Sequence, residues 1–222
     1  MVMQDRAIRT RWTILTAAAK VFEERGYLAA TISEILTTAG VTKGALYFHF
    51  PTKEDLAEGV IREQDHQLPI PDRACKVQQL VDTTFLQAYR LQTDLLVRAG
   101  VRLSLDHQAQ GLDRSGPFLR WSTVGIDLLE KAQAQGELMP HVVPAETSDV
   151  LVGAFAGVQA MSQAMSNYED LPRRVSALLR YVLPSVVVPP VLAAVDFSEG
   201  RGASVHSELQ DMHIVQQPTF LS

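Results

Sequence analysis

The chain has 222 residues, 46% of them hydrophobic and 20% charged, so it can fold around one or two buried cores. That composition excludes disordered and fibrous proteins. The net charge of −5 at first argues against a nucleic-acid partner, because phosphate groups attract Lys and Arg.

Three helices are predicted at the N-terminus. Apolar residues at helical spacing predict the first helix over residues 6–25, and Gly26 ends it. The stripe consists of Ile8, Trp12, Leu15, Ala19 and Phe22. The second helix follows Thr31, since Thr31-Ile32-Ser33-Glu34 has the form of a capping box, and Gly40 can end it in a left-handed conformation. Thr42 can cap the third helix, and together the elements form a helix-turn-helix.

The charge distribution favours DNA as the partner of this N-terminal segment. Residues 1–53 hold seven Lys or Arg and four Asp or Glu, which gives a net charge of +3. Because the whole chain has a net charge of −5, the other 169 residues carry a net charge of −8. A basic head on an acidic body suggests two tasks, of which only the first is electrostatic.

The third helix is predicted to read the major groove with its first residues, Thr42, Lys43 and Gly44. Gly44 costs about 1 kcal/mol relative to Ala in a helix, and close approach of backbone to DNA would explain it. Taken singly, Tyr47 reads as a core aromatic, His49 as a surface histidine and Lys53 as a solvated charge; only their joint arrangement favours phosphate contacts. Phe48 and Phe50 are assigned to the core. The candidates for the remaining DNA contacts are an N-terminal arm with Arg6, Arg9 and Arg11, together with Thr31, Tyr47, His49 and Lys53.

A fourth helix is predicted from the break at Pro51 to about Gln67, followed by a linker at Pro69-Ile70-Pro71. Gln64 falls on its apolar stripe. A buried amide without partners costs about 1–3 kcal/mol, so either protein groups or a ligand must satisfy it. Beyond the linker, Cys75 is the only cysteine, which excludes an internal disulfide, and the N-terminus lacks the apolar core of a signal peptide. These features predict a cytoplasmic protein.

The remainder of the chain repeats helical periodicity without a competing strand pattern, which predicts an all-α fold. The predicted domains are a DNA-binding domain over 1–53, a ligand-binding and dimerisation domain over 54–196, and a C-terminal segment over 197–222 that is partly disordered. The most apolar run, 181–195, contains three prolines and is shorter than the about 20 residues that a membrane span needs.

One helix, over about 147–165, is apolar on all sides and is therefore expected to be buried on all sides. A broad face that includes Val150, Met161 and Met165 is expected to pack on the chain's own core. A face of small residues is expected to pack, together with the next helix over about 170–182, in the four-helix interface of a homodimer. The predicted interface residues are Gly153, Gly157, Ala160, Ala164, Val175, Leu178 and Val182.

Residues 9–55 resemble the DNA-binding domain of the TetR repressor family. The resemblance rests on Gly26-Tyr27, Ala39-Gly40-Val41 and the run from Lys43 to Phe50 followed by Lys53-Glu54. Further along, Arg98 to Leu103, Gly111-Leu112-Asp113, Gly116-Pro117-Phe118 and Trp121 are similar to the gamma-butyrolactone receptors of Streptomyces and relatives. The resemblance implies an all-helical dimer that represses genes for antibiotic production and development and leaves DNA when a small lactone binds.

A ligand pocket is predicted in the body, with Trp121 stacked on the lactone ring as the resemblance implies. The expected lining is Gln64, Phe85, Leu103, Phe118, Trp121, Phe155, Val158 and Gln159, with Gln163 as another polar candidate. No cofactor, metal or catalytic residue is expected, because the chain has no nucleophile elbow, no His-Glu-x-x-His and no phosphate loop. Three alternatives to a lactone-responsive repressor are a related regulator that senses an antibiotic or another metabolite, an enzyme, and a helical carrier that does not bind DNA.

Overall fold

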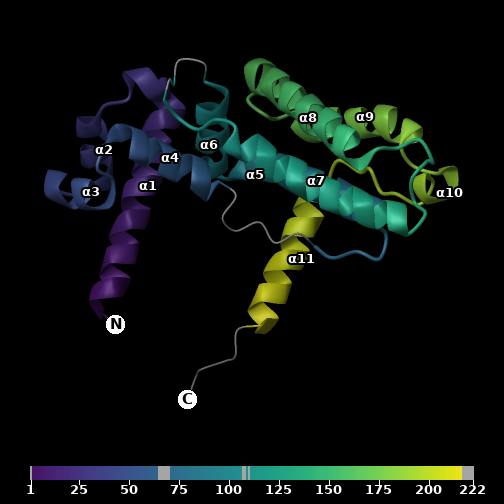
Figure 1. The fold of residues 1–222 in the computed structure, drawn as a ribbon. Coiled ribbons are helices and arrows are strands. Elements are labelled where there is room, and N and C mark those ends of the chain that lie inside the picture. The colour runs from purple at the N-terminus through teal and green to yellow at the C-terminus, as the bar shows by residue number, and fades with distance from the viewer. Residues whose placement is uncertain (1, 65–70, 107–108, 110, 217–222) are drawn as a thin grey trace. The chain divides into compact units, whose positions relative to one another are not determined.

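The structure, a computed structural model, describes residues 2–64, 71–106, 109 and 111–216. Within these residues the chain is helical, with no β-strand and only an isolated antiparallel bridge between Leu138 and Val187. Figure 1 labels the helices. They are α1 (Val2–Ala29), α2 (Ile32–Ala39), α3 (Lys43–His49), α4 (Lys53–Glu63), α5 (Lys76–Thr93), α6 (Leu95–Leu105), α7 (Gly116–Ala134), α8 (Pro144–Ser166), α9 (Leu171–Val182), the 3₁₀ turn η1 (Leu183–Ser185), α10 (Pro189–Leu192) and α11 (Arg201–Gln216). The predicted all-α class is confirmed.

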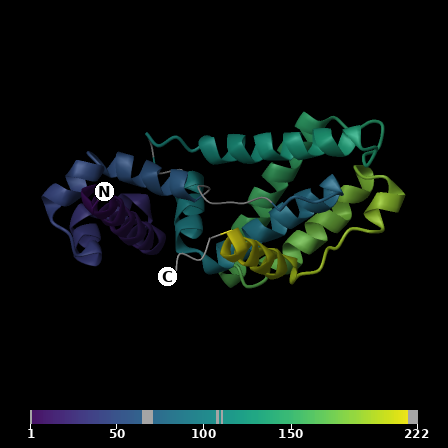
Figure 2. The same cartoon turned by 90° about the horizontal axis from the view of Figure 1, so that it is seen from below.

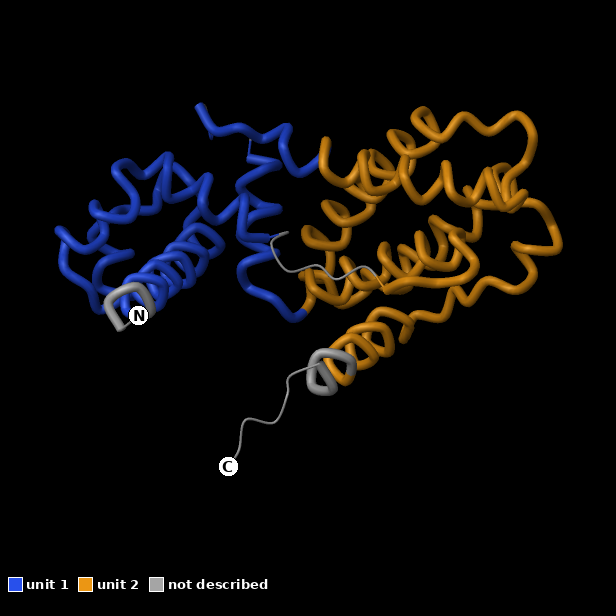
Figure 3. Tube along the Cα trace, turned by 60° about the horizontal axis from the view of Figure 1, so that its bottom comes forward, with its two compact units in different colours: residues 1–68, 93–118 blue, residues 69–92, 119–222 orange. Residues whose placement is uncertain are grey.

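The chain divides into two compact units, shown in Figure 3. Unit 1 contains residues 1–68 and 93–118, and so holds α1 to α4 and α6. Unit 2 contains residues 69–92 and 119–222, and so holds α5, nearly all of α7, and α8 to α11. In unit 1, α4 and α6 pack in the same core as α1. Packing does not test where the DNA-binding function ends, so the functional division expected after residue 53 stays a prediction.

The N-terminal helices end where local signals predict. Gly26 interrupts α1 with φ of 77° and ψ of 170°, and Gly40 ends α2 in the left-handed region with φ of 64°. At the start of α2, the Thr31 hydroxyl accepts a hydrogen bond from the Glu34 amide at 3.2 Å, and the Glu34 carboxylate accepts from the Thr31 amide at 3.0 Å. This reciprocal pair is the predicted capping box.

The start of α1 differs from expectation. The helix begins at Val2, so Arg6, Arg9 and Arg11 lie within it and do not form a separate arm. Ile8 is about half exposed and does not belong to the buried stripe, which includes Leu15, Ala19 and Phe22. The buried positions continue on the face of α1 that packs against α4 and α6.

The core of unit 1 lies between α1, α4 and α6 and is completed by side chains from α2 and α3. Leu46 and Phe50 reach into it, whereas Phe48 has 81% of its surface exposed. The assignment of Phe48 to the core was wrong: α3 is short, and the side that carries Leu46 faces inward. An ion pair between Arg98 and Glu23, at 2.9 Å, also connects α6 to α1.

In unit 2, the first turn of α5 is capped by a residue far along the chain. The Glu137 carboxylate accepts hydrogen bonds from the amides of Lys76 at 3.0 Å and Val77 at 2.8 Å. These amides have no partner inside the helix, and a carboxylate at a helix N-terminus also interacts favourably with the helix dipole. The segment after α7 is thereby fixed to the start of α5.

The helices α8 and α9 lie side by side in unit 2 (Figure 1). The predicted burial of α8 on all sides was wrong, because Val150, Met161 and Met165 are more than half exposed. Polar Ser148, Gln159 and Ser162 are buried instead, and the Ser162 hydroxyl donates to Asp170 at 2.7 Å. Thus α8 presents an apolar face that the described residues of the chain leave uncovered.

A further expectation needs correction. Val175 is fully buried within its own chain, at 0% exposure, so it supports α9 from beneath and offers no surface to a second subunit. In the C-terminal segment that is expected to be partly disordered, residues 201–216 form the helix α11. Figure 2 shows α11, in yellow, beside α5. Residues 65–67, the linker residues Pro69 and Ile70, and 217–222 lie outside the described residues.

Candidate nucleic-acid interface and ligand residues

The helix α3 is anchored on one side and open on the other. Leu46 is fully buried on the inner side, while Thr42, Lys43, Gly44 and Tyr47 are exposed. The Thr42 hydroxyl accepts from the Ala45 amide at 3.3 Å, which caps the helix and leaves the hydroxyl proton available to an outside acceptor. The Lys43 ammonium lies 5.8 Å from the centre of the Tyr47 ring, so the two side chains share one exposed surface.

Phe48 is the exposed residue of α3 that sequence reasoning missed. Its ring meets the His49 ring edge-on, with the centroids 5.1 Å apart. Helical geometry contained a usable signal, since adjacent residues point about 100° apart and Leu46, Phe48 and Phe50 cannot all face one core in a single short helix. An exposed phenyl ring on this helix can contact thymine methyl groups.

Lys53 lies at the start of α4, which a capping box between Thr52 and Asp55 begins. Its ammonium donates to the Leu28 carbonyl at 3.4 Å and lies 4.6 Å from the centre of the Tyr27 ring. Burial lowers the pKa of Lys53, while the nearby Glu54 acts in the opposite direction. The cation is thus held at the α4 N-terminus, where dipole and charge together attract a phosphate.

Tyr27 connects the end of α1 to α4. Its hydroxyl donates to the Glu54 carboxylate at 2.9 Å. Burial, and then this hydrogen bond to an anion, raise the pKa of Tyr27 to about 12. The phenol is therefore protonated under all ordinary conditions. Its hydrogen bond to Glu54 holds the Tyr27 ring, over which the Lys53 ammonium lies.

The other predicted DNA contacts differ in their freedom. Arg6 and Arg9 are exposed on α1. Arg11 is half-buried, lies 5.2 Å over the Phe50 ring and pairs with Glu63 at 3.6 Å, so intramolecular contacts already engage it. The Thr31 hydroxyl both accepts from the Glu34 amide and donates to the Glu34 carboxylate, and its capping role accounts for its position.

Gln64 is the predicted ligand residue with an unexplained atom. The side chain is only 1% exposed, and its Nε2 has no hydrogen-bond partner among the described residues. It packs directly on α6, where a Cβ built on Gly100 would lie 2.8 Å from the Gln64 Cβ and 3.0 Å from its Oε1. Leu103, one turn further along α6, is buried in the same core. Unit 1 therefore brings Gln64 and the α6 face of Leu103 close together.

The other predicted ligand residues are distributed over both units. Phe118 is half-buried in unit 1, whereas Trp121, Phe155 and Val158 are half-buried in unit 2. Phe85 and Gln159, also in unit 2, are buried. A single pocket built from both groups stays a prediction.

Sequence reasoning missed Gln87 on α5. This residue is buried, and its Oε1 has no partner among the described residues. The signal was similar to that for Gln64, because Gln87 lies at helical spacing from the apolar residues Leu80 and Leu91 of α5. An unpaired buried acceptor is a place where a ligand donor would relieve a cost.

The predicted dimer face forms a strip of small residues on α8. Gly153, Gly157, Ala160 and Ala164 are all exposed, and nothing in the described chain approaches a Cβ built on either glycine within 4 Å. On α9, Leu178 and Val182 are half-buried. Among the described residues, no group of three or more His, Cys, Asp or Glu is arranged to hold a metal ion. None of the helices described is long and apolar enough to cross a membrane.

Comparison with known proteins relates this architecture to bacterial regulators. The family model described as "Bacterial regulatory proteins, tetR family" matches residues 14–60. The A-factor receptor protein of Streptomyces griseus is 38% identical over 203 residues, which cover 90% of this chain and 72% of that protein. The crystal structure of TylP, a TetR regulator from Streptomyces fradiae, is 45% identical with a TM-score of 0.83, covering 91% of this chain and 98% of that one.

A third relative is described as a gamma-butyrolactone receptor, an ArpA-like protein. Its structure is 29% identical with a TM-score of 0.67, and the match covers 91% of this chain and 99% of that one. The matched family model contains α2, α3 and their caps, and the full-length relatives extend the similarity through both units. The chain therefore belongs to the TetR family of bacterial regulatory proteins and is similar to gamma-butyrolactone receptors.

Proposed function

We propose that the protein is a repressor that binds a palindromic operator as a homodimer and leaves it when a small gamma-butyrolactone-type molecule binds, and that it controls antibiotic production and development. The observation that carries the DNA-binding half is α3, a capped helix whose outer side presents Thr42, Lys43, Gly44 and Tyr47 to solvent. The ligand half is supported by the similarity to the A-factor receptor protein and to a gamma-butyrolactone receptor.

Operator recognition divides between base and phosphate contacts. Lys43 can donate to guanine O6 and N7, and Gly44 permits close approach of the helix backbone. Tyr47, His49 and Lys53 can donate to phosphate oxygens, which sets the register of the helix on the duplex. Arg6 and Arg9 can add further phosphate contacts from the exposed side of α1.

Dimerisation is supported by the uncovered face of α8. The exposed small residues allow two helices to approach closely, and the exposed Val150, Met161 and Met165 extend the strip. Large exposed apolar patches on a single chain mark contact sites. A homodimer carries two copies of α3, as a palindromic operator with half-sites roughly 34–36 Å apart requires.

Within unit 1, α4 provides a route from ligand to DNA. Its C-terminal end carries Gln64, and its middle packs on the end of α3, because a Cβ built on Gly59 would lie 2.9 Å from Phe50 Cε1. A ligand that accepts a hydrogen bond from Gln64 Nε2 would stabilise one position of α4, and Phe50 would transmit the change to α3. The ligand need only bind the DNA-incompetent state more tightly.

The DNA-binding half predicts that Lys43→Ala weakens operator binding by about 1–3 kcal/mol, the range for loss of a direct base contact. Footprinting upstream of the protein's own gene would supply the operator, and gel-shift titration would give the affinity. Lys20→Ala is the matched control, because it removes the same charge from an exposed position of α1. Equal affinities for Lys43→Ala and wild-type protein would contradict the assignment of α3 as the reading helix.

The ligand half of the proposal predicts that a lactone releases the wild-type protein from its operator. Gln64→Ala or Trp121→Ala should raise the lactone concentration that is needed for half-maximal release. Loss of one hydrogen bond to a neutral partner corresponds to about 1 kcal/mol, or roughly a fivefold shift. Calorimetry with a panel of gamma-butyrolactones, butenolides, furans and antibiotics would identify the class. Unchanged release in both variants would refute the pocket assignment, and binding of an antibiotic alone would assign the protein to the regulators that sense other metabolites.

A further inference from the structure

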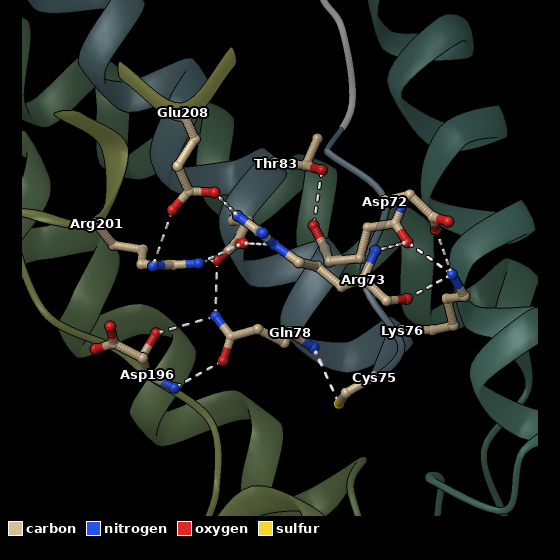
Figure 4. A network of polar contacts seen from close by, with 11 residues as sticks. Asp72, Arg73, Cys75, Lys76, Gln78, Thr83, Asp196, Arg201 and Glu208 are labelled. Carbon is tan, nitrogen blue, oxygen red and sulfur yellow. Dashed lines mark hydrogen bonds and ion pairs between the residues drawn. The ribbon is translucent and has the colours of Figure 1, made fainter. Parts of the chain in front are cut away.

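A cluster of charged side chains holds α11 against α5 within unit 2 (Figure 4). The guanidinium of Arg201 donates to both carboxylate oxygens of Asp82, at 2.7 and 2.8 Å. The same carboxylate accepts from Arg73 Nε at 2.7 Å. Glu208, two turns along α11, accepts from Arg73 and lies 3.8 Å from Arg201. The cations of Arg73 and Arg201 and the anions of Asp82 and Glu208 therefore connect α11 to α5 and to the residues just before it.

Close backbone packing adds to the charge cluster. A Cβ built on Gly202 would lie 2.3 Å from the Phe85 carbonyl oxygen and 2.9 Å from Tyr89 Cβ, so α11 approaches α5 as only glycine allows. Val205 and Leu209 are buried on the same side of α11, and the His206 ring lies 5.0 Å from the Tyr89 ring. The docked position is thus specific, and a larger residue at 202 would prevent it.

Asp82 would remain paired if α11 moved away. Its side chain is 0% exposed, and an unpaired carboxylate there would be costly. However, Arg73 and Gln78 donate to Asp82 from the α5 side, both at 2.7 Å. Burial acts to raise the pKa of Asp82, but the hydrogen bonds from Arg201, Gln78 and Arg73 outweigh it and hold the pKa below its usual value. Release of α11 therefore exposes no orphan charge at the centre of the cluster.

Arg73 contacts both helices, since it pairs with Asp82 of α5 and with Glu208 of α11. Arg73 precedes α5 and follows the segment that leads from α4 into unit 2. Its guanidinium is divided between Asp82 of α5 and Glu208 of α11. Docked α11 thus holds the side chain of Arg73, which lies three residues before α5. Gly202 of α11 also packs against the backbone carbonyl of Phe85, which is a predicted ligand residue.

We propose that α11 is a reversible strap, which when docked fixes Arg73 at the entry to unit 2, and that the ligand response requires the docked state. The second half rests on the proposed function, since it concerns release from an operator. Undocking leaves unit 2 folded around Asp82, Arg73 and Gln78 but removes the Glu208 contact from Arg73 and the packing of Gly202 on Phe85.

Hydrogen exchange followed by mass spectrometry tests the strap without a ligand. Glu208→Gln removes both charge contacts of Glu208 with little change in size, and Gly202→Val blocks the close approach. Asp211→Asn is the matched control, because it removes the same charge from an exposed position of α11. In both test variants, amides of residues 201–211 and 71–80 are expected to exchange at least about tenfold faster, the change for a local opening favoured by 1.4 kcal/mol. Unchanged exchange in residues 71–80 would overturn the proposal.

Gel-shift titration with the gamma-butyrolactone panel tests the functional half. Glu208→Gln is expected to retain operator affinity and to require at least about fivefold more lactone for half-maximal release, the lower end of usual coupling between sites. Loosened exchange with an unchanged lactone requirement would overturn the requirement for docking. If no lactone releases the wild-type protein, the proposed ligand class is wrong, and the exchange experiment alone decides for or against the strap.

Discussion

Phe22→Ala is expected to lower the free energy of unfolding by about 3–5 kcal/mol, the range for deletion of a buried phenyl ring. Phe22 is 0% exposed at the centre of the core formed by α1, α4 and α6. Its ring lies 6.0 Å from that of Tyr27, so the mutation also removes a packing partner of the ring over which the Lys53 ammonium lies. Urea denaturation followed by circular dichroism would measure the loss, and operator binding should fall with the folded fraction.

Phe48→Ala is the matched control, because it deletes the same ring from a position that is 81% exposed. Its free energy of unfolding should stay within about 0.5 kcal/mol of wild type, as for surface substitutions in general. If the exposed side of α3 contacts DNA as proposed, operator affinity should nevertheless fall, since the Phe48 ring lies on that exposed side. Equal destabilisation by the two mutations would show that Phe48 is buried in solution and would contradict the placement of this surface.

Gly59→Val is the second mutation with a large expected effect. The first atom of any side chain at this position would lie 2.9 Å from Phe50 Cε1 and 3.1 Å from Leu15 Cδ2, and both neighbours are buried. Because neither can move into open space, the loss should be about 1–3 kcal/mol or more, as for other overpacked cores. Thermal denaturation would report it as a lower melting temperature.

Gly44→Ala provides the contrast on α3. No described residue lies within 4 Å of a Cβ built on Gly44, so the change should stabilise the helix by about 1 kcal/mol. If Gly44 serves close approach to DNA, the same methyl group should reduce operator affinity while the melting temperature rises. A stabilised protein with wild-type affinity would remove the functional reason for glycine at this position.

Local chemistry made the N-terminal elements predictable. The capping box of Thr31 and Glu34, the left-handed Gly40 and the Thr42 cap each depend on residues within a few positions, so sequence alone locates them. The same is true of Gln64, whose place on an apolar stripe predicted burial correctly. The nature of its partner was not predictable, because that depends on atoms outside the helix.

The errors arose where burial is decided at a distance. Phe48 and Val150 are apolar, but their exposure depends on which side of a helix finds a neighbour. Val175 was predicted to contact a second subunit, although residues of its own chain bury it completely. The docking of α11 on α5 was not predictable, because its contacts are charges paired with Arg73 and Asp82 more than one hundred positions earlier, and no periodicity reveals such pairs.

The long-range contacts of α5 also impose an order on biosynthesis. Protein synthesis delivers the N-terminal part first, and Glu137, which caps α5, follows Lys76 by 61 positions, whereas Glu208 follows Arg73 by 135. At about 5–20 residues per second, roughly 3–12 s separate the first pair and roughly 7–27 s the second. The residues of unit 1 are all translated earlier, since its last segment ends at residue 118. A nascent chain can therefore complete the core that carries α3 before it can close the core that carries α5.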